Sequence, residues 1–307
     1  GNRWYAIAVS LVIIVGGTAM TVARGGLPLG IDFSGGTLMV LEFEQSISED
    51  TVRNELVTVD EKIVQQYGDS GAGILIRLPQ GGREEGTSLE RGAEQIVATL
   101  EASELGAFEV VSRELVGPVI GEELQRRGIS AFVFAMIGIL VYVGLRFRFS
   151  FGIGAIVAVV HDILVTLALL TVFGYELSLN VVAAMLTITG YSVNDSIVVF
   201  DRVRENIRST RKGGFADTLN LSINECLSRT VITSLTTLIA VIVLMTWGGE
   251  VIRDFTITLL IGVVVGTYSS ICLAPILLLN FGIYRGAEDE NGDRKESESS
   301  SAFSPVG

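Results

Sequence analysis

A carboxylate, an amide and several hydroxyls lie inside one apolar stretch of this chain. Residues 181–200 are long enough to cross a bilayer, and they contain Ser192, Asn194 and Asp195. Placing a carboxylate near the bilayer interior costs about 2.5–3.5 kcal/mol, so such a group usually faces a partner or a water-filled path. The pattern predicts that Asp195 takes part in moving a proton or another ion. The alternative is a buried polar clamp between helices.

A second charge lies at a matching depth in the next apolar stretch. Asp195 precedes Asp201 by six residues, which places it about 9 Å inside the helix end at 1.5 Å per residue. Arg229 begins the following span from the same side. A buried carboxylate beside a cation stays ionised and takes up a proton when the cation moves away. The pair therefore predicts a link between protonation and helix movement. The alternative for Arg229 is an interfacial anchor.

Two neutral residues flank this pair. Asn194 either orients Asp195 or bonds the next helix. Thr233 follows Arg229 by four residues on the same helical face. Its hydroxyl either hydrates a proton path or forms an ordinary hydrogen bond between helices.

A third apolar stretch carries His161 and Asp162 near its middle. Their side chains are expected to point about 100° apart on a helix. Both a structural role and a relay role stay open for each. Asp162 is the stronger relay candidate, because a carboxylate at this depth is costly without a function.

Enzyme and cofactor chemistry finds no support in the motifs. His161 is the one histidine of the chain, so a multi-histidine metal site and a nucleophile–His–acid set are excluded. No Gly-x-x-x-x-Gly-Lys-Ser/Thr run is present to cradle phosphates. Cys226 and Cys272 suggest neither a disulfide framework nor a metal site. We predict no enzymatic activity, no cofactor and no bound metal.

Composition indicates a polytopic membrane protein. Hydrophobic residues make up 49% of the 307 residues, and the mean hydropathy is +0.53. Charged residues make up 18%, below the roughly 25% of soluble domains. Six spans are predicted, at about 4–23, 129–147, 151–173, 179–200, 230–247 and 255–282. We expect the first to be retained as a helix rather than cleaved as a signal peptide.

The charge pattern divides the chain and orients it. The net charge of −12 is concentrated in residues 24–128, which form an acidic extracytoplasmic domain after the first transmembrane helix at 1–23. Residues 129–284 form a five-helix membrane domain with a cytoplasmic amphipathic segment at 201–228. The basic segments between spans predict that both termini are cytoplasmic. An acidic tail at 285–307 is expected to be disordered. Clustered cations are lacking, so nucleic acid is not an expected partner.

The extracytoplasmic domain reads as a small α/β unit. Strands are predicted at 37–43, 73–78 and 108–112. Helices are predicted from Ser48 to Tyr67 and from Ser88 to Leu105. Between spans four and five, the apolar spacing of 215–227 predicts a helix lying on the cytoplasmic surface.

Several segments together resemble one known family. Residues 30–36, Gly-Ile-Asp-Phe-Ser-Gly-Gly, match the Gly-x-Asp-Phe-x-Gly-Gly signature of the SecD/SecF family of protein-export membrane proteins. His161-Asp162, residues 190–206 and the run from Ser228 to Ser234 match further family features in the right order. From the residues alone, Asp32 is read as shaping the tight exit from the first span.

The resemblance implies a six-helix unit related to the resistance–nodulation–division transporters, with a ferredoxin-like external domain. It implies pairing with SecD and use of the proton-motive force in late protein export across the cell inner membrane. It also supports Asp195 as proton carrier and Arg229 as its partner. The implied partners are SecD, the SecYEG channel, YidC or YajC, the exported preprotein and membrane lipid.

Two rival functions remain. One is half of a proton-coupled small-molecule exporter, which would need a pocket in a larger external portion. The other is a non-transporting membrane scaffold, which predicts that Asp195 tolerates replacement by Asn.

Overall fold

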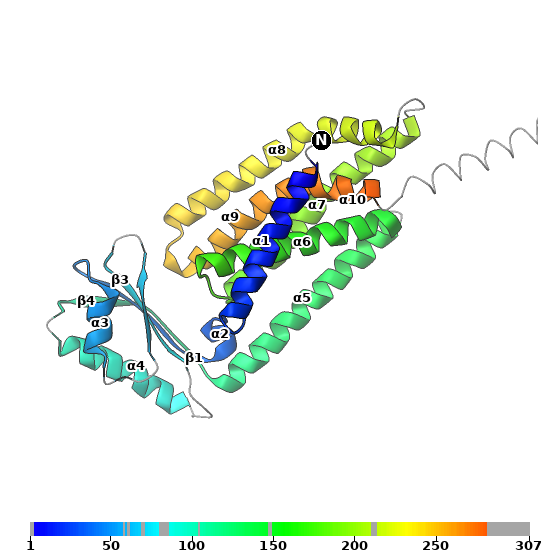
Figure 1. Ribbon diagram of the computed structural model, residues 1–307. Coiled ribbons are helices and arrows are strands. Elements are labelled where there is room, and N and C mark those ends of the chain that lie inside the picture. The colour runs from blue at the N-terminus through cyan, green and yellow to red at the C-terminus, as the bar shows by residue number, and fades with distance from the viewer. Residues whose placement is uncertain are drawn as a thin grey trace, which may run out of the picture.

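The computed structural model describes residues 3–280 except 58, 60–61, 69–70, 80–85, 104, 147–148 and 210–213. An α/β domain lies at one end of a bundle of long helices (Figure 1). The described N-terminal residues and the last helix, α10, lie together at the opposite end of the bundle. The acidic tail predicted at 285–307 lies outside the described residues.

Five helical stretches are long and apolar enough to cross a membrane: Val119–Leu145, Gly152–Phe173, Leu179–Ser209, Phe215–Trp247 and Arg253–Leu279. They correspond to the second to sixth predicted spans. The first predicted span is α1, Arg3–Ala23, whose apolar part Ile7–Ala23 is shorter. The predicted fold class, a helical membrane protein with a small α/β domain, is confirmed.

The α/β domain has the chain order of a ferredoxin-like fold. Its elements are β1 Gly36–Phe43, α3 Glu49–Glu55, β2 Ile63–Tyr67, β3 Gly73–Pro79, α4 Gly86–Glu101 and β4 Phe108–Val116. The strands form one antiparallel sheet in the order β2-β3-β1-β4. Alternate residues along the strands, such as Met39 and Ile76, pack with Val52 of α3 and Ile96 of α4. Both helices therefore cover the same face of the sheet.

One element of this domain was predicted wrongly. The helix expected from Ser48 to Tyr67 ends at Glu55, and residues 63–67 form β2 instead. Ser48 does cap α3, because its side chain accepts a hydrogen bond from the Thr51 N–H. Ile63 and Val64 are β-branched and pair with β3, and Val64 is buried in the domain core. Pairing with the following strand outweighs the local helical pattern.

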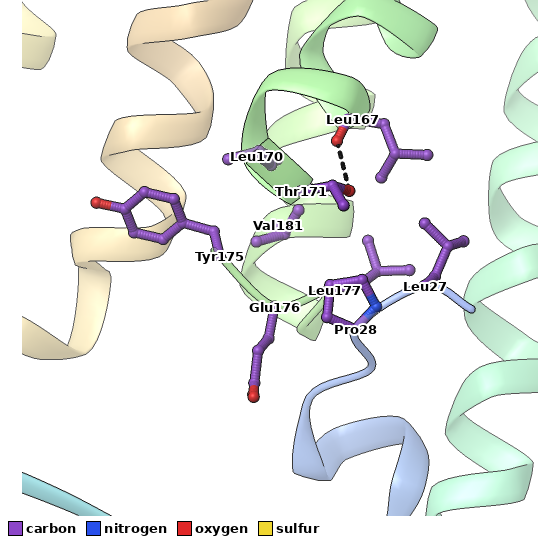
Figure 2. A pocket seen from close by; sticks show the side chains of 9 residues that line it. All are labelled: Leu27, Pro28, Leu167, Leu170, Thr171, Tyr175, Glu176, Leu177 and Val181. Atoms are coloured by element: carbon purple, nitrogen blue, oxygen red, sulfur yellow. Dashed lines mark hydrogen bonds between the residues drawn. The ribbon is translucent and has the colours of Figure 1, made fainter. Parts of the chain in front are cut away.

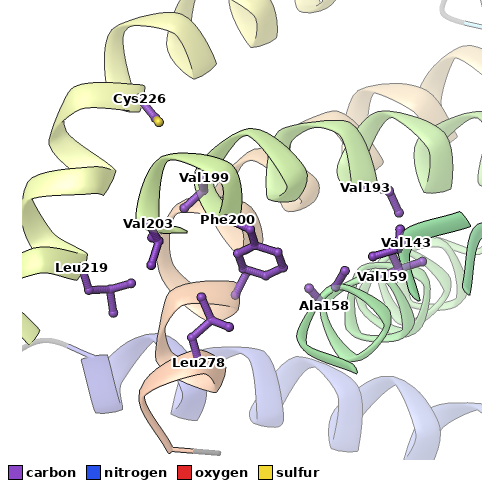
Figure 3. Close-up of a cluster of buried hydrophobic side chains, with 12 residues drawn as sticks. Val143, Ala158, Val159, Val193, Val199, Phe200, Val203, Leu219, Cys226 and Leu278 are labelled. Carbon is purple, nitrogen blue, oxygen red and sulfur yellow. The ribbon is translucent and has the colours of Figure 1, made fainter. Parts of the chain in front are cut away.

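The helix predicted on the cytoplasmic surface at 215–227 is the first part of a longer helix. It is continuous with the fifth predicted span in α8, Phe215–Trp247. Leu219 and Cys226 are buried in a cluster with Phe200 and Val203 of α7, Leu179–Ser209 (Figure 3). The apolar face of this segment is therefore turned toward a neighbouring helix.

Helix α7 lies among the remaining helices. It contacts α6 Phe149–Phe173, α8 and α9 Arg253–Tyr268. Helix α9 follows a short 3₁₀ turn, Glu250–Ile252, and continues through a π-helix, Ser269–Leu273, into α10, Ala274–Asn280. Long α5, Pro118–Arg146, begins directly after β4 and contacts the short α2, Ile31–Ser34.

Glycines allow the central helices to approach closely. A Cβ at Gly262 would collide with the side chain of Ile188, and one at Gly266 would lie 3.3 Å from Cβ of Ser192. A Cβ at Gly17 of α1 would likewise collide with the Cβ of Ala168 in α6. Gly262 and Gly266, four residues apart on α9, therefore face α7.

Candidate functional site

Asp195 is buried in α7, with 3% of its surface exposed. Its Oδ2 atom has no hydrogen-bond partner among the described residues. A buried carboxylate oxygen without a partner is unfavourable, so native structures keep few of them. Among the described residues, Oδ2 of Asp195 therefore contributes no hydrogen bond that holds neighbouring helices together.

Arg229 of α8 is the cation whose charge acts on Asp195. Helices α7 and α8 are neighbours, as the sequence-based pairing required. Arg229 is solvent-exposed, and no hydrogen bond or ion pair joins it to Asp195 among the described residues. Among the described residues, the two charges therefore interact through space without a direct bond.

A polar cavity of about 510 Å³ opens beside Arg229. Tyr142 of α5 and Val198 of α7 contribute to its wall, together with charged residues from α7 and α8. It lies at the end of the bundle away from the α/β domain, where α7 ends and α8 begins. Water can therefore approach the guanidinium from that side of the membrane.

An ion-pair network lines this cavity, and the sequence did not predict it. Arg202 pairs with Glu205 at 2.6 Å and with Glu225 of α8 at 2.7 Å. Buried Asn206 donates to Glu225 at 2.7 Å and to the Ser222 hydroxyl at 3.0 Å. Arg202 and Asn206 thus join the last part of α7 to the first part of α8. Because Arg202 is engaged in these ion pairs, Arg229 is the cation whose charge acts on Asp195.

The two neutral candidates do not touch Asp195. Asn194 is exposed on the outside of the described bundle, and neither of its two predicted roles, orienting Asp195 or bonding the next helix, is seen among the described residues. Thr233 is half-buried and donates to the carbonyl of Thr230, one turn earlier in its own helix. Thr233 therefore makes a local backbone bond.

Hydroxyls that do connect helices lie one turn from Asp195. The Tyr191 hydroxyl of α7 donates to Ser234 of α8 at 2.9 Å. Ser234 in turn lies 2.8 Å from the Thr267 hydroxyl of α9. This series of hydrogen-bonded hydroxyls ties α7, α8 and α9 together on the side of Asp195 nearer the α/β domain.

Asp162 of α6 belongs to a separate polar cluster. It is 1% exposed, and its Oδ2 accepts hydrogen bonds from Ser192 at 2.5 Å and from Ser269 at 2.7 Å. Its Oδ1 lies 3.0 Å from Nδ1 of His161. The predicted relay residues thus form two groups, one at Asp195 and Arg229 and one at Asp162.

The other end of α7 is fastened to the segment that follows α1 (Figure 2). Leu177 donates to the carbonyl of Pro28 at 2.7 Å, and Gly30 donates back to Leu177 at 2.8 Å. Asp32 accepts from the backbone N–H of Leu179 at 2.7 Å. A Cβ at Gly30 would lie 3.0 Å from the Leu177 carbonyl, so this strand-like pairing needs a small residue there. Asp32 does more than shape the exit from α1, because it holds the start of α7.

The sheet joins this fastening through Arg77. Arg77 of β3 pairs with Glu176 at 2.5 Å and donates to the Leu29 carbonyl at 2.8 Å. The pKa of Glu176 is raised above its usual value. Burial is the largest cause and the charge of Asp254 adds to it, whereas Arg77 lowers the pKa in part. Arg77, Glu176 and the backbone pairing of 28–30 with 177 form what we call the clasp. It links the α/β domain, the exit from α1 and the entry to α7.

The clasp and the Asp162 cluster join residues far apart in the chain. Arg77 and Glu176 carried no local signal, because each looks like an ordinary surface charge in sequence. Ser192 and Ser269 looked like helix-packing hydroxyls. Among the residues beside the clasp, Asp32 did stand in a sequence motif, the Gly-x-Asp-Phe-x-Gly-Gly segment at 30–36.

Long apolar helices around a buried carboxylate, with an α/β domain after the first helix, define a polytopic membrane protein. The profile described as "Protein export membrane protein SecD/SecF, C-terminal" matches residues 96–283. That of the "SecD/SecF GG Motif" matches residues 24–47, which include the Asp32 segment. The chain belongs to the SecD/SecF family.

Related proteins support this family membership. The chain is 43% identical over 282 residues to a protein of Desulfurispirillum indicum named "Protein translocase subunit SecF", covering 90% of this chain and 89% of that one. It is 39% identical to the protein of the same name from Pseudomonas aeruginosa, covering 91% and 89% of the two chains.

A crystal structure of the translocon-associated protein SecDF from Thermus thermophilus shares the fold. The TM-score is 0.80 at 36% sequence identity, and the match covers 92% of this chain and 38% of that one. The chain thus corresponds to less than half of that longer polypeptide.

Proposed function

We propose that this chain is a non-enzymatic subunit of the Sec translocase that uses the proton-motive force to promote late stages of protein export. The observation that carries the proposal is the buried Asp195 carboxyl, with an unpartnered oxygen, near the Arg229 charge and the polar cavity. The names of the SecF relatives support the assignment to the translocase.

The proposed step is a change of charge at Asp195. With Arg229 close, the carboxylate is ionised. When Arg229 swings into the cavity, burial disfavours the charged form and the carboxyl takes up a proton. The loss of attraction between the two groups then allows α7 and α8 to shift. One charge crossing about 100 mV gains roughly 2.3 kcal/mol, so repeated cycles are needed to bias a long chain outward.

The α/β domain is the proposed output of this cycle. Its clasp holds the start of α7, so a displacement of α7 is transmitted to Arg77 and the sheet. The domain is proposed to lie outside the cytoplasmic membrane, with both chain ends in the cytoplasm. SecD is the proposed membrane partner, because SecDF of Thermus thermophilus carries both names in one chain. SecYEG, YidC or YajC and the preprotein are proposed contacts of the assembly.

Export of a secreted reporter tests the proposal. Cells in which this chain replaces the resident subunit are compared with cells carrying Asp195→Asn. Export is expected to fall at least tenfold, since Asn cannot exchange a proton. Asp217→Asn is the control, because Asp217 is an exposed carboxylate near the start of α8 and is not one of the residues that line the cavity. It is expected to export normally.

Protein amount and association with SecD are measured in the same cells. Lost export with normal amount and association supports a titrating carboxyl. Normal export with Asp195→Asn overturns the proposal and favours a non-transporting scaffold.

A further inference from the structure

We propose that Asp162, with His161, Ser192 and Ser269, forms a second proton-binding site within the membrane part of the chain. The site stands on its own geometry. Its consequence for export rests on the proposed function, because only a proton-driven cycle would use it.

The first argument is the missing counter-charge. Asp162 is almost fully buried, and none of the described arginine or lysine side chains contacts it. The free energy of burying an isolated carboxylate is prohibitive, so such a group is paired or neutralised. Two serine hydroxyls donate to Oδ2, but they are neutral and stabilise the negative charge only in part.

The second argument concerns His161, whose Nδ1 lies 3.0 Å from Oδ1 of Asp162. The side chain of His161 is 10% exposed, and its Nε2 is buried with no partner among the described residues. An imidazolium would need an acceptor at both nitrogens. A neutral ring that accepts at Nδ1 carries its own proton on Nε2, so the unpartnered Nε2 weighs equally against both forms of the ring. The 3.0 Å contact places Nδ1 and Oδ1 where one proton can be shared between His161 and Asp162.

The third argument is the local helix geometry. Ser269 opens the π-helix Ser269–Leu273, and its hydroxyl is within reach of both Asp162 Oδ2 and the Gly266 carbonyl, at 2.7 and 3.1 Å. The next residue, Ser270, lies 3.2 Å from Ser196 of α7. A π-turn inside a helix is uncommon and frequently marks a functional site. Here it brings two consecutive hydroxyls against α6 and α7.

Other ionisable groups do not explain the cluster. The apolar part of α1, residues 7–23, contains none, and neither does α10. At membrane depth the elements packed near α6 contribute five ionisable groups: Tyr142, Tyr191, Asp195, Tyr268 and Cys272. No bond joins any of them to Asp162 among the described residues.

The proposed exchange involves one proton at the Asp162 carboxyl. The carboxyl takes one proton from the aqueous phase on Oδ1 and, when protonated, donates it to His161 Nδ1. On release, the carboxylate keeps the hydroxyl donors of Ser192 and Ser269. Because Ser192 and Asp195 lie three residues apart on α7, a rotation of α7 would change both sites at once.

Infrared spectroscopy of the full chain in lipid vesicles tests the site, because a protonated carboxyl absorbs separately from a carboxylate. We expect a pH-dependent carboxyl band that Asp162→Asn removes. Asp195→Asn and the control Thr189→Val should retain it. Thr189 is a buried hydroxyl of the same helix that bonds only its own backbone, at Met185.

The serines provide the second variant. Ser192→Ala and Ser269→Ala each remove one hydrogen-bond donor to Asp162 Oδ2, so the frequency of the carboxyl band should shift in each variant. A spectrum that neither serine variant nor Asp162→Asn alters would overturn the site. Should Asp162→Asn fail to fold, unchanged spectra of both serine variants alone would overturn it. The carboxyl band is also measured in the Asp195→Asn variant. The test of the Asp162 site therefore does not depend on whether the export proposal holds.

Discussion

Asp32 Oδ2 accepts a hydrogen bond from the backbone N–H of Leu179 at 2.7 Å. A residue of the Gly-x-Asp-Phe-x-Gly-Gly segment therefore holds the first residue of α7. Asp195 lies sixteen residues further along that helix, about 24 Å away at 1.5 Å per residue. A continuous helix thus connects the fastening beside the α/β domain to the buried carboxyl.

The start of α7 is expected to be weakened by loss of either of its two side-chain caps. Ser178 Oγ accepts from the Val181 N–H at 3.3 Å, and Asp32 accepts from Leu179. Ser178→Ala should lower the unfolding free energy by about 1 kcal/mol. Asp32→Ala should lower it by more, because a negative charge at a helix N-terminus is also favourable. Thermal unfolding in detergent measures both, and equal effects would argue against the charge contribution.

Loss of Arg77 is expected to open the clasp. The Arg77 side chain is 9% exposed, whereas that of Glu176 is 34% exposed. Breaking a buried ion pair costs about 3–5 kcal/mol, and partial solvation of Glu176 should reduce this for Arg77→Ala to about 2 kcal/mol. Hydrogen exchange at the N–H groups of Gly30 and Leu177 should accelerate, because both bond across the clasp.

Arg113→Ala is the control for that measurement. Arg113 of β4 is exposed and donates to the Glu90 carbonyl within the same domain. It should leave exchange at Gly30 and Leu177 unchanged. Equal acceleration in both variants would show that the domain as a whole, and not the clasp, had loosened.

Glu114 is expected to make the stability of the protein depend on pH. Burial raises the pKa of Glu114, and the negative charges of Asp32 and Asp254 raise it further. The folded protein therefore holds this proton more tightly than the unfolded chain. Its contribution to stability is lost as pH rises from the ordinary carboxyl range through the raised value.

Glu114→Gln should consequently melt at a slightly higher temperature than the unsubstituted protein at neutral pH. The difference should shrink as the pH falls, because Glu114 then becomes neutral in both states. Glu109→Gln, on the same exposed strand, is the control. A melting difference that does not change with pH would count against the assigned cause.

Gly262→Ala is expected to force α9 away from α7, because its Cβ would collide with Ile188. Overpacking of this kind costs about 1–3 kcal/mol. Gly138→Ala in α5 is the matched control, since nothing lies within 4 Å of its added Cβ. Adding Ile188→Ala to Gly262→Ala removes the colliding atoms and should restore part of the melting temperature. Without that recovery, the collision is not the cause.

Much of the fold could be predicted from local patterns. Long apolar runs place the helices, because a span is recognised from its own residues without reference to its neighbours. The alternation of β1 and the cap at Ser48 are local for the same reason. That Asp195 and Arg229 lie on neighbouring helices, close enough for the charge of Arg229 to act on Asp195, was accessible too, because the depth of each follows from its distance to a helix end.

Contacts between distant segments decided the rest. Residues 63–67 form a strand because the next strand, β3, lies alongside them, and the local helical spacing of 48–67 does not record that pairing. Asp32 and Leu179 are 147 positions apart, and Asp162 and Ser269 are 107 apart. Whether a carboxyl is solvated, capped or left without a counter-charge depends on what packs around it. The sequence thus determined which groups lie in the membrane, and the tertiary structure decided which of them meet.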